Sequence, residues 1–240
     1  MQSIKILGLI LFFYFTTLSF AQNAVDQAAM LKAYEAAIYD ASVYKFSNLR
    51  PLKPLKFDEI TKTAEVVTFT NWTGYKVGKM TLTRDIWVTA EPEVKEVCKT
   101  FSENVELRLR QLLGLHPNNN YDRFVSIEVK QGDIFRPTAN PDPATPFPCS
   151  CPITPKCGEE FPKNTEDTSY VRWMADQMLN SYIISESPII PYGYPWTRLG
   201  YTYDWKPGAN KYGASEYVIR KNSEINVTEA TPVFTYCKKP

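Results

Sequence analysis

The first 21 residues constrain the fold of this chain most strongly, because they indicate the compartment in which it folds. Lys5 precedes an apolar run from Ile6 to Phe20, and Ala21 ends the segment. This pattern predicts a secretory signal peptide cleaved after Ala21, so that the folded chain starts at Gln22. A membrane anchor is the alternative, but the run of about 15 residues is shorter than the roughly 20 that a spanning helix needs. We therefore expect a secreted or periplasmic protein, without a membrane span after cleavage, in which disulfides can form.

Charge argues against nucleic-acid binding. Removal of the first 21 residues removes one charged side chain, Lys5, and leaves 26 basic and 26 acidic ones. Nucleic-acid binding needs a basic excess or stripe to neutralise phosphates. The only basic clusters are the pairs Arg220-Lys221 and Lys238-Lys239, so we expect a small molecule, a glycan or a protein as the partner.

Five cysteines follow the predicted cleavage site: Cys98, Cys149, Cys151, Cys157 and Cys237. An odd number leaves at least one unpaired within a monomer, and about fifteen arrangements of two bridges are possible. Cys98 lies on the apolar stripe of a predicted helix, where a thiol behaves as a small hydrophobe, so we expect it to be free. The disulfide candidates are then Cys149, Cys151, Cys157 and Cys237. A zinc site on the first three of these is disfavoured, because the Cys-x2-Cys spacing of common zinc sites is absent, and we expect no metal.

Hydrophobic periodicity predicts an α+β fold, with an antiparallel or mixed sheet packed by about three helices. We expect one domain over residues 22–240. It contains a proline- and cysteine-rich insertion at 136–168, which disulfides would hold in place. The predicted helices are 24–45, 90–113 and 168–181. The predicted strands are two within 65–90 joined by a hairpin loop at 71–78, then 122–130, 216–220, 225–228 and 233–237.

The segment 192–205 is the richest in groups that could bind a ligand, because six large aromatic residues fall within it. Extended backbone would place alternate rings on one face, where they can stack on a ligand while an arginine and an aspartate orient it. Core packing is the more frequent role of such rings, but binding groups are often placed on turning backbone like this one. The candidate ligand-binding residues are Tyr194, Trp196, Arg198, Tyr201, Tyr203, Asp204 and Trp205.

Most enzyme templates are missing from the sequence. His116 is the only histidine, which excludes a multi-histidine metal site and leaves a Ser-His-Asp triad dependent on one residue. Neither a Walker loop nor a Gly-x-Gly-x-x-Gly fingerprint is present, so we expect no cofactor. The sequence favours an exported, non-catalytic binding or envelope-associated protein.

An enzyme is the alternative. Arg198, Ser215 and Glu216, with the strand-like run Glu216 to Arg220, resemble the arginine, serine and glutamate signals of secreted toxins that transfer ADP-ribose or cleave NAD. The resemblance covers the C-terminal quarter and implies that Arg198 holds a phosphate while Glu216 stabilises a ribosyl cation. Ala214 stands where a second acidic residue would precede Glu216 by two positions. This alternative is a secreted transferase or hydrolase that uses Arg198 and Glu216.

Overall fold

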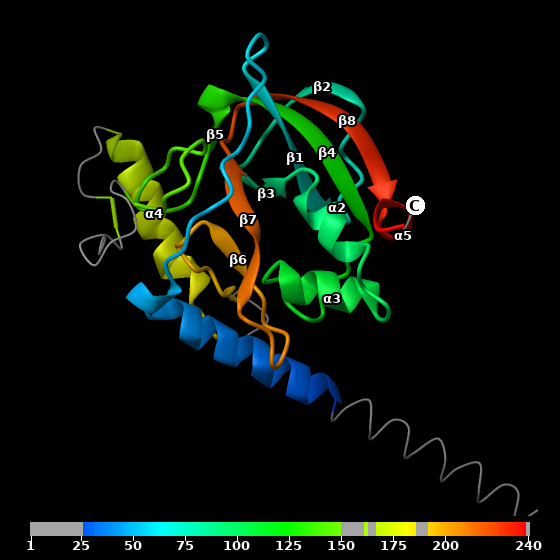
Figure 1. Cartoon of the computed structure of the whole chain (residues 1–240), viewed down its shortest axis with the longest axis vertical. Coiled ribbons are helices and arrows are strands. Elements are labelled where there is room, and N and C mark those ends of the chain that lie inside the picture. The colour runs from blue at the N-terminus through cyan, green and yellow to red at the C-terminus, as the bar shows by residue number, and fades with distance from the viewer. Residues whose placement is uncertain (1–25, 150–160, 163–166, 186–191, 239–240) are drawn as a thin grey trace, which may run out of the picture.

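A single curved sheet organises the chain. The structure is a computed structural model that describes residues 26–149, 161–162, 167–185 and 192–238. In that part, eight strands pair antiparallel in the order β2-β8-β4-β1-β3-β7-β5, and β6 pairs with β7 (Figure 1). The strands are β1 (Thr63–Thr70), β2 (Gly78–Thr81), β3 (Ile86–Ala90), β4 (Arg123–Lys130), β5 (Ile134–Phe135), β6 (Tyr201–Tyr203), β7 (Tyr212–Ile219) and β8 (Glu224–Pro232).

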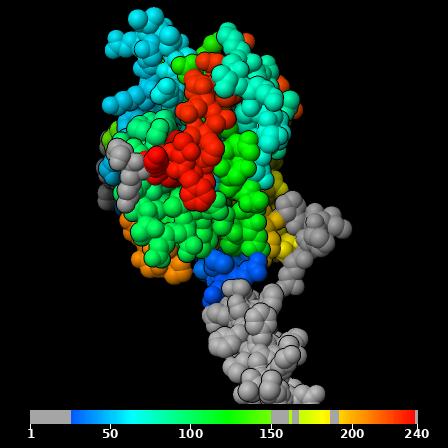
Figure 2. Space-filling model, turned by 90° about the vertical axis from the view of Figure 1, so that its right-hand side faces the viewer, coloured from blue at the N-terminus to red at the C-terminus, as the bar shows by residue number. Residues whose placement is uncertain are grey.

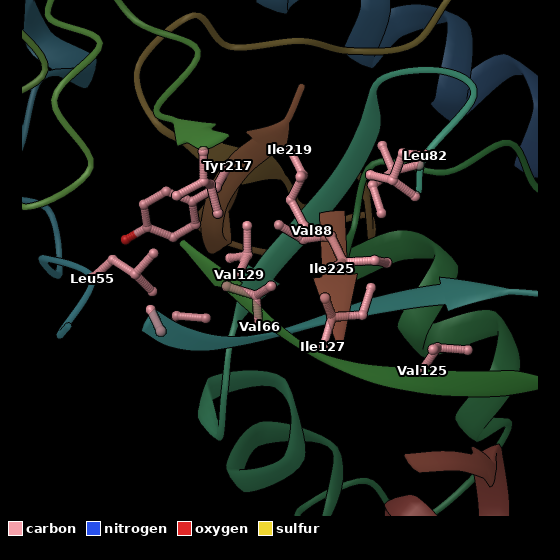
Figure 3. Packing of buried hydrophobic residues seen from close by; sticks show 14 of the residues in the cluster. Leu55, Val66, Leu82, Val88, Val125, Ile127, Val129, Tyr217, Ile219 and Ile225 are labelled. Atoms are coloured by element: carbon pink, nitrogen blue, oxygen red, sulfur yellow. The ribbon is translucent and has the colours of Figure 1, made fainter. Parts of the chain in front are cut away.

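The two faces of the sheet bury different clusters, because side chains alternate along each strand. On one face, Val66, Val88, Ile127 and Ile219 belong to an aliphatic core to which six strands contribute. Figure 3 shows these side chains pointing toward one another across the curved sheet. The residues between them along the strands point to the opposite face, where the helices lie.

The helices cover that second face and one end of the sheet (Figure 1). A helix over residues 26–42 buries Tyr34 and Ile38. Both α2 and α3 contact β7, while α5 contacts β4 and β8. The helices after residue 42 are η1 (Phe46–Asn48), α2 (Glu93–Cys98), α3 (Val105–Leu112), η2 (Gln131–Asp133), α4 (Thr168–Ser181) and α5 (Val233–Tyr236).

The α+β class and the antiparallel sheet are confirmed. The helix predicted at 168–181 is α4, and Asp167 caps it by accepting hydrogen bonds from the Ser169 and Tyr170 amides. Such a side-chain cap satisfies donors that the first turn leaves free. The strand predicted at 122–130 is β4.

Three predicted elements are wrong. Strands β1 and β2 form no hairpin, because β2 pairs with β8 while β1 pairs with β3 and β4. The helix predicted over 90–113 is broken into α2 and α3, with Asn104 in the left-handed region at φ 47°. The last predicted strand is the short helix α5, which follows Pro232. In these segments the apolar period did not determine where the backbone turns.

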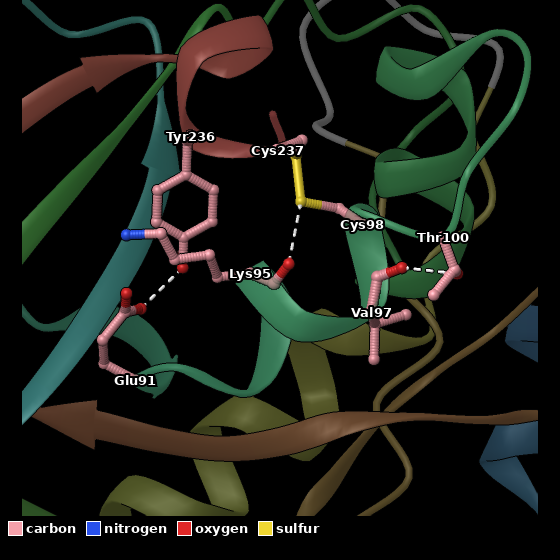
Figure 4. Close-up of a disulfide and its surroundings, with 7 residues drawn as sticks. All are labelled: Glu91, Lys95, Val97, Cys98, Thr100, Tyr236 and Cys237. Atoms are coloured by element: carbon pink, nitrogen blue, oxygen red, sulfur yellow. Dashed lines mark hydrogen bonds between the residues drawn. A yellow bond between two sulfur atoms is a disulfide. The ribbon is translucent and has the colours of Figure 1, made fainter. Parts of the chain in front are cut away.

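The expectation that Cys98 is free is also wrong, because Cys98 forms a disulfide with Cys237. Figure 4 shows this bond joining the end of α2 to the end of α5, with Tyr236 reaching Glu91 beside it. An apolar helix face can hold half of a disulfide as readily as a free thiol, and the sequence does not distinguish the two. Cys149 is disulfide-bonded as well, while Cys151 and Cys157 lie outside the described residues.

The C-terminal strand lies within the sheet rather than at its edge. Strand β8 pairs with β2 on one side and with β4 on the other. Figure 2 shows β8 and α5, in red, crossing this face of the molecule. The last described elements therefore complete the sheet.

The described part of the proline-rich insertion packs against the segment before β1. Leu52 and Leu55 donate backbone hydrogen bonds to the carbonyls of Pro146 and Pro143. Arg136 is fully buried and donates to carbonyls of Lys53, Pro143, Thr145 and Gly200 and to the Tyr217 hydroxyl.

No helix in the described ranges is both long enough and apolar enough to cross a membrane.

Candidate functional site

A row of paired residues on the helix-covered face of the sheet forms the floor of the candidate site. Val67 on β1 pairs with Thr89 on β3, and Thr89 pairs with Glu216 on β7. Their neighbours Val66, Val88 and Tyr217 belong to the aliphatic core on the opposite face. Strand alternation therefore turns Glu216 away from the aliphatic core and toward the helix-covered face.

A cavity of about 800 Å³ lies above this row. Strands β1, β3 and β7 line one side, and the segments 113–121 and 192–194 line the other. This volume is within the roughly 300–1,000 Å³ typical of small-molecule sites. Its aromatic lining includes Tyr34, Phe69, Tyr75, Trp87, Tyr192 and Tyr194.

Glu216 is the acidic group on the floor of the cavity. Its side chain is 8% exposed, and its Oε2 atom is fully buried without a hydrogen-bond partner in the described part of the chain. Burial alone raises the pKa of this carboxyl to about 8, because the ionised form loses its hydration. A buried polar group without a partner costs about 1–3 kcal/mol. A carboxyl held in this way within a cavity is a candidate binding or acid–base group.

Packing fixes the groups around Glu216. Its own backbone amide donates to the carbonyl of Gly200. The Trp87 ring meets the Tyr194 ring edge to face at 5.5 Å and the Trp196 ring at 6.0 Å. The Tyr194 hydroxyl donates to Oε1 of Gln177 on α4. The cavity wall is therefore preorganised by contacts from three separate segments.

His116 lines the same cavity. Its ring lies 5.1 Å from those of Tyr34 and Tyr192. Its Nδ1 atom accepts a hydrogen bond from the backbone N–H of Asn118, which places the proton of the neutral ring on Nε2. Burial lowers the pKa of His116, so the ring is neutral at pH 7.

Arg84 and Asp85 also line the cavity. Arg84 is exposed in the turn between β2 and β3, where its charge acts on Tyr75 and Tyr121. Asp85 accepts hydrogen bonds from the Trp173 indole and the Lys221 amide. The basic side chain therefore lies toward solvent, while the unpartnered acid lies on the floor.

Of the aromatic residues predicted to bind a ligand, Tyr194 lines the large cavity and four others do not. Those four, which are 1–7% exposed and belong to three separate packing clusters, are Trp196, Tyr201, Tyr203 and Trp205. Tyr201 and Tyr203 line a crevice of about 10 Å³, which holds at most one water molecule. Core packing thus accounts for these rings, as the alternative interpretation of the segment held.

Arg198 and Asp204 contact protein groups elsewhere. Arg198 donates to the carbonyls of Ala41 and Ser42 at the end of the 26–42 helix, and its guanidinium lies over the Tyr182 ring. Asp204 forms a two-bond ion pair with Arg108. Of the residues that the toxin resemblance pairs, Glu216 lines the cavity and Arg198 does not.

The sequence reasoning missed Trp87 and Tyr34 as lining residues. Trp87 lies between the core residues Ile86 and Val88 on β3. Because side chains alternate along a strand, the Trp87 side chain points to the opposite face from those two. That alternation was visible in the sequence, but which elements cover that face was not.

Comparison with known proteins gives no family for this chain. Among the described residues, no cluster of three or more histidine, cysteine, aspartate or glutamate side chains could hold a metal ion. No protein-family model matches the chain, and no curated protein or solved structure shows significant similarity to it. A functional proposal therefore depends on the geometry of the cavity.

Proposed function

We propose that this chain is an exported, non-catalytic binding protein that holds a small organic molecule in the cavity above Glu216. The buried Oε2 atom of Glu216, which has no hydrogen-bond partner among the described residues, is the observation that carries the proposal. A ligand that reaches the cavity floor would supply the partner that the fold does not. The aromatic walls would provide apolar contact area for the rest of that ligand.

The proposal of export rests on the N-terminal pattern. Residues 1–21 have the charge, apolar run and small terminal residue of a signal peptide. The Cys98–Cys237 disulfide is compatible with an oxidising compartment. A secreted or periplasmic protein of this kind would meet its ligand outside the cytoplasm.

A fragment screen with a cavity-blocking variant tests the binding function. Thr89→Phe adds a ring beside Glu216, whereas Thr81→Phe adds the same ring at the exposed end of β2. We expect fragments found by ligand-observed NMR to lose at least about tenfold in affinity with the first variant and to keep it with the second. Near-UV circular dichroism checks that both variants fold. A screen without hits, or hits that a folded Thr89→Phe variant binds unchanged, would exclude the proposal.

Acid–base catalysis is a second candidate, favoured by the pKa of about 8 at Glu216. A carboxyl that titrates near neutral pH can give or take a proton in a reaction. In this candidate, Glu216 retains the catalytic role that the transferase or hydrolase alternative gave it. Arg198 no longer serves as the phosphate-holding group, because it contacts the end of the 26–42 helix. NAD cleavage and hydrolysis of chromogenic esters and glycosides are the assays. Glu216→Gln should abolish any turnover and leave the fold largely intact.

A further inference from the structure

The floor of the cavity carries an acidic side chain, Glu216, that forms no ion pair with a basic side chain in the described part. Burial is the cause of the raised pKa of Glu216. Arg84, which also lines the cavity, is exposed and acts on Tyr75 and Tyr121 instead. A cationic ligand group would therefore meet an acid to which the described residues supply no ion-pair partner.

Two further polar side chains of the lining, Thr202 and Asp85, are already engaged. Thr202 donates to the Leu112 carbonyl at 2.7 Å and accepts from the Ala214 amide at 2.9 Å. Asp85 accepts from Trp173 at 2.7 Å and from the Lys221 amide at 2.6 Å. A ligand with one charged group and an apolar body fits the lining.

The aromatic wall strengthens this preference. Trp87 and Tyr194 line the cavity with Glu216 and meet at 5.5 Å. Tyr194 is close enough for the Glu216 charge to raise its pKa. Aromatic faces attract organic cations, most strongly where water is excluded, and a carboxylate beside them adds an ion pair.

We propose that the cavity binds an organic cation, an amine or a quaternary ammonium with an apolar body, whose charge pairs with Glu216 beside Trp87 and Tyr194. This inference rests on the proposed function, because it requires that the cavity is a ligand site. It adds the chemical class of the ligand and the residue that selects it.

Proton release accompanies binding of such a ligand. Glu216 is largely protonated at pH 7 when the cavity holds no cation, and a cation favours its ionised form. The other titratable groups lining the cavity are Tyr34, Tyr75, Tyr121, Tyr192, Tyr194, His116, Asp85 and Arg84. Burial raises the pKa of Tyr34, Tyr75, Tyr121 and Tyr194 and lowers that of His116. As pH increases toward 8, the affinity for a permanent cation should therefore rise about tenfold per pH unit. Above pH 8 the affinity should level off.

The test compares two probes of the same shape with the purified protein. Benzyltrimethylammonium carries a permanent charge, and neopentylbenzene is its neutral carbon counterpart. Titration calorimetry and saturation-transfer NMR from pH 6 to 9 should show the cation bound at least about tenfold more tightly at pH 8.5. Only the affinity for the cation should depend on pH.

Variants assign the effect to one carboxyl. Glu216→Gln should remove the preference for the cation and keep binding of the neutral probe, whereas Glu224→Gln, on the exposed side of β8, should change neither. Equal affinity of the wild-type protein for both probes at every pH would overturn the inference and leave the binding function intact. Absence of binding by either probe, together with a fragment screen without hits, would overturn both.

Discussion

At the scale of single residues, Glu216 makes a predictable contribution to how stability depends on pH. Its pKa is about 4.5 in an unfolded chain and about 8 in the fold. Between these values the folded state binds more protons than the unfolded state. The free energy of unfolding should therefore fall as pH rises, by up to about 1.4 kcal/mol per pH unit, and the loss is complete above pH 8.

Urea denaturation of the wild-type protein and Glu216→Gln at pH 5, 6, 7 and 8 measures this effect. We expect the variant to lose stability less steeply over that range, because it has no carboxyl to ionise. Glu224→Gln, at an exposed ion pair with Lys79, should follow the wild-type slope. Parallel curves for the wild-type protein and Glu216→Gln would mean that Glu216 titrates at its ordinary pKa.

The Arg108–Asp204 ion pair gives a second prediction. The Asp204 side chain is 4% exposed and accepts two hydrogen bonds from the guanidinium of Arg108, at 2.6 and 3.1 Å. Asp204→Ala should cost about 3 kcal/mol of stability, because it leaves a largely buried charge unpaired. Adding Arg108→Ala should cost less than the sum of the two single changes, as a double-mutant cycle would show. Additive costs would mean that the two side chains do not interact in solution.

Single residues also show which properties the sequence did not predict. Glu216 was identified through a local pattern, and the structure places it on a cavity floor. Trp196 and Asp204 were chosen for chemical type, yet both are buried against other elements. Residue type and spacing do not report which segment packs on a strand face. That depends on the long-range arrangement of the chain.

At the scale of elements, apolar periodicity predicted faces better than boundaries. Val94, Leu109 and Leu112, which belong to the predicted apolar stripe, are all buried, although α2 and α3 are separate helices. Asn104 interrupts them with a left-handed backbone conformation that few residue types adopt easily. Residues 99–104 separate the two helices, and the apolar spacing that runs across them gave no sign of this break.

Two substitutions at Asn104 test this account. Asn104 is exposed, so changes there act mainly through the backbone. Asn104→Ala should lower the free energy of unfolding by about 1 kcal/mol, because alanine is strained at a positive φ. Asn104→Gly should have little effect or stabilise slightly, since glycine adopts this conformation freely. Thermal denaturation measures the stability of both variants. An alanine variant at least as stable as the glycine variant would contradict the prediction.

At the scale of the whole molecule, the Cys98–Cys237 disulfide closes most of the described chain into one loop. The two cysteines are 139 positions apart in the sequence. A crosslink of this span restricts the unfolded chain, so replacing both cysteines by serine should cost about 2–5 kcal/mol. Denaturation in guanidinium chloride measures the loss.

Reduction supplies the control for this prediction. Cys149 is disulfide-bonded as well. Dithiothreitol should therefore lower the free energy of unfolding of the wild-type protein at least as much as the double serine substitution does. Any further loss when the variant itself is reduced reports the bond of Cys149. A double variant as stable as the oxidised wild-type protein would show that the long crosslink contributes nothing to folding.

The position of β8 also has a consequence for biosynthesis. A ribosome makes β2 and β4 well before β8, yet β8 is the strand that pairs with both. Until β8 emerges, the nascent chain has two open strand edges that could pair with other chains. Cys237 emerges later still, so the long crosslink cannot form on a half-made chain. The complete sheet therefore cannot form before β8 has been made, because two of its strands wait for that one partner.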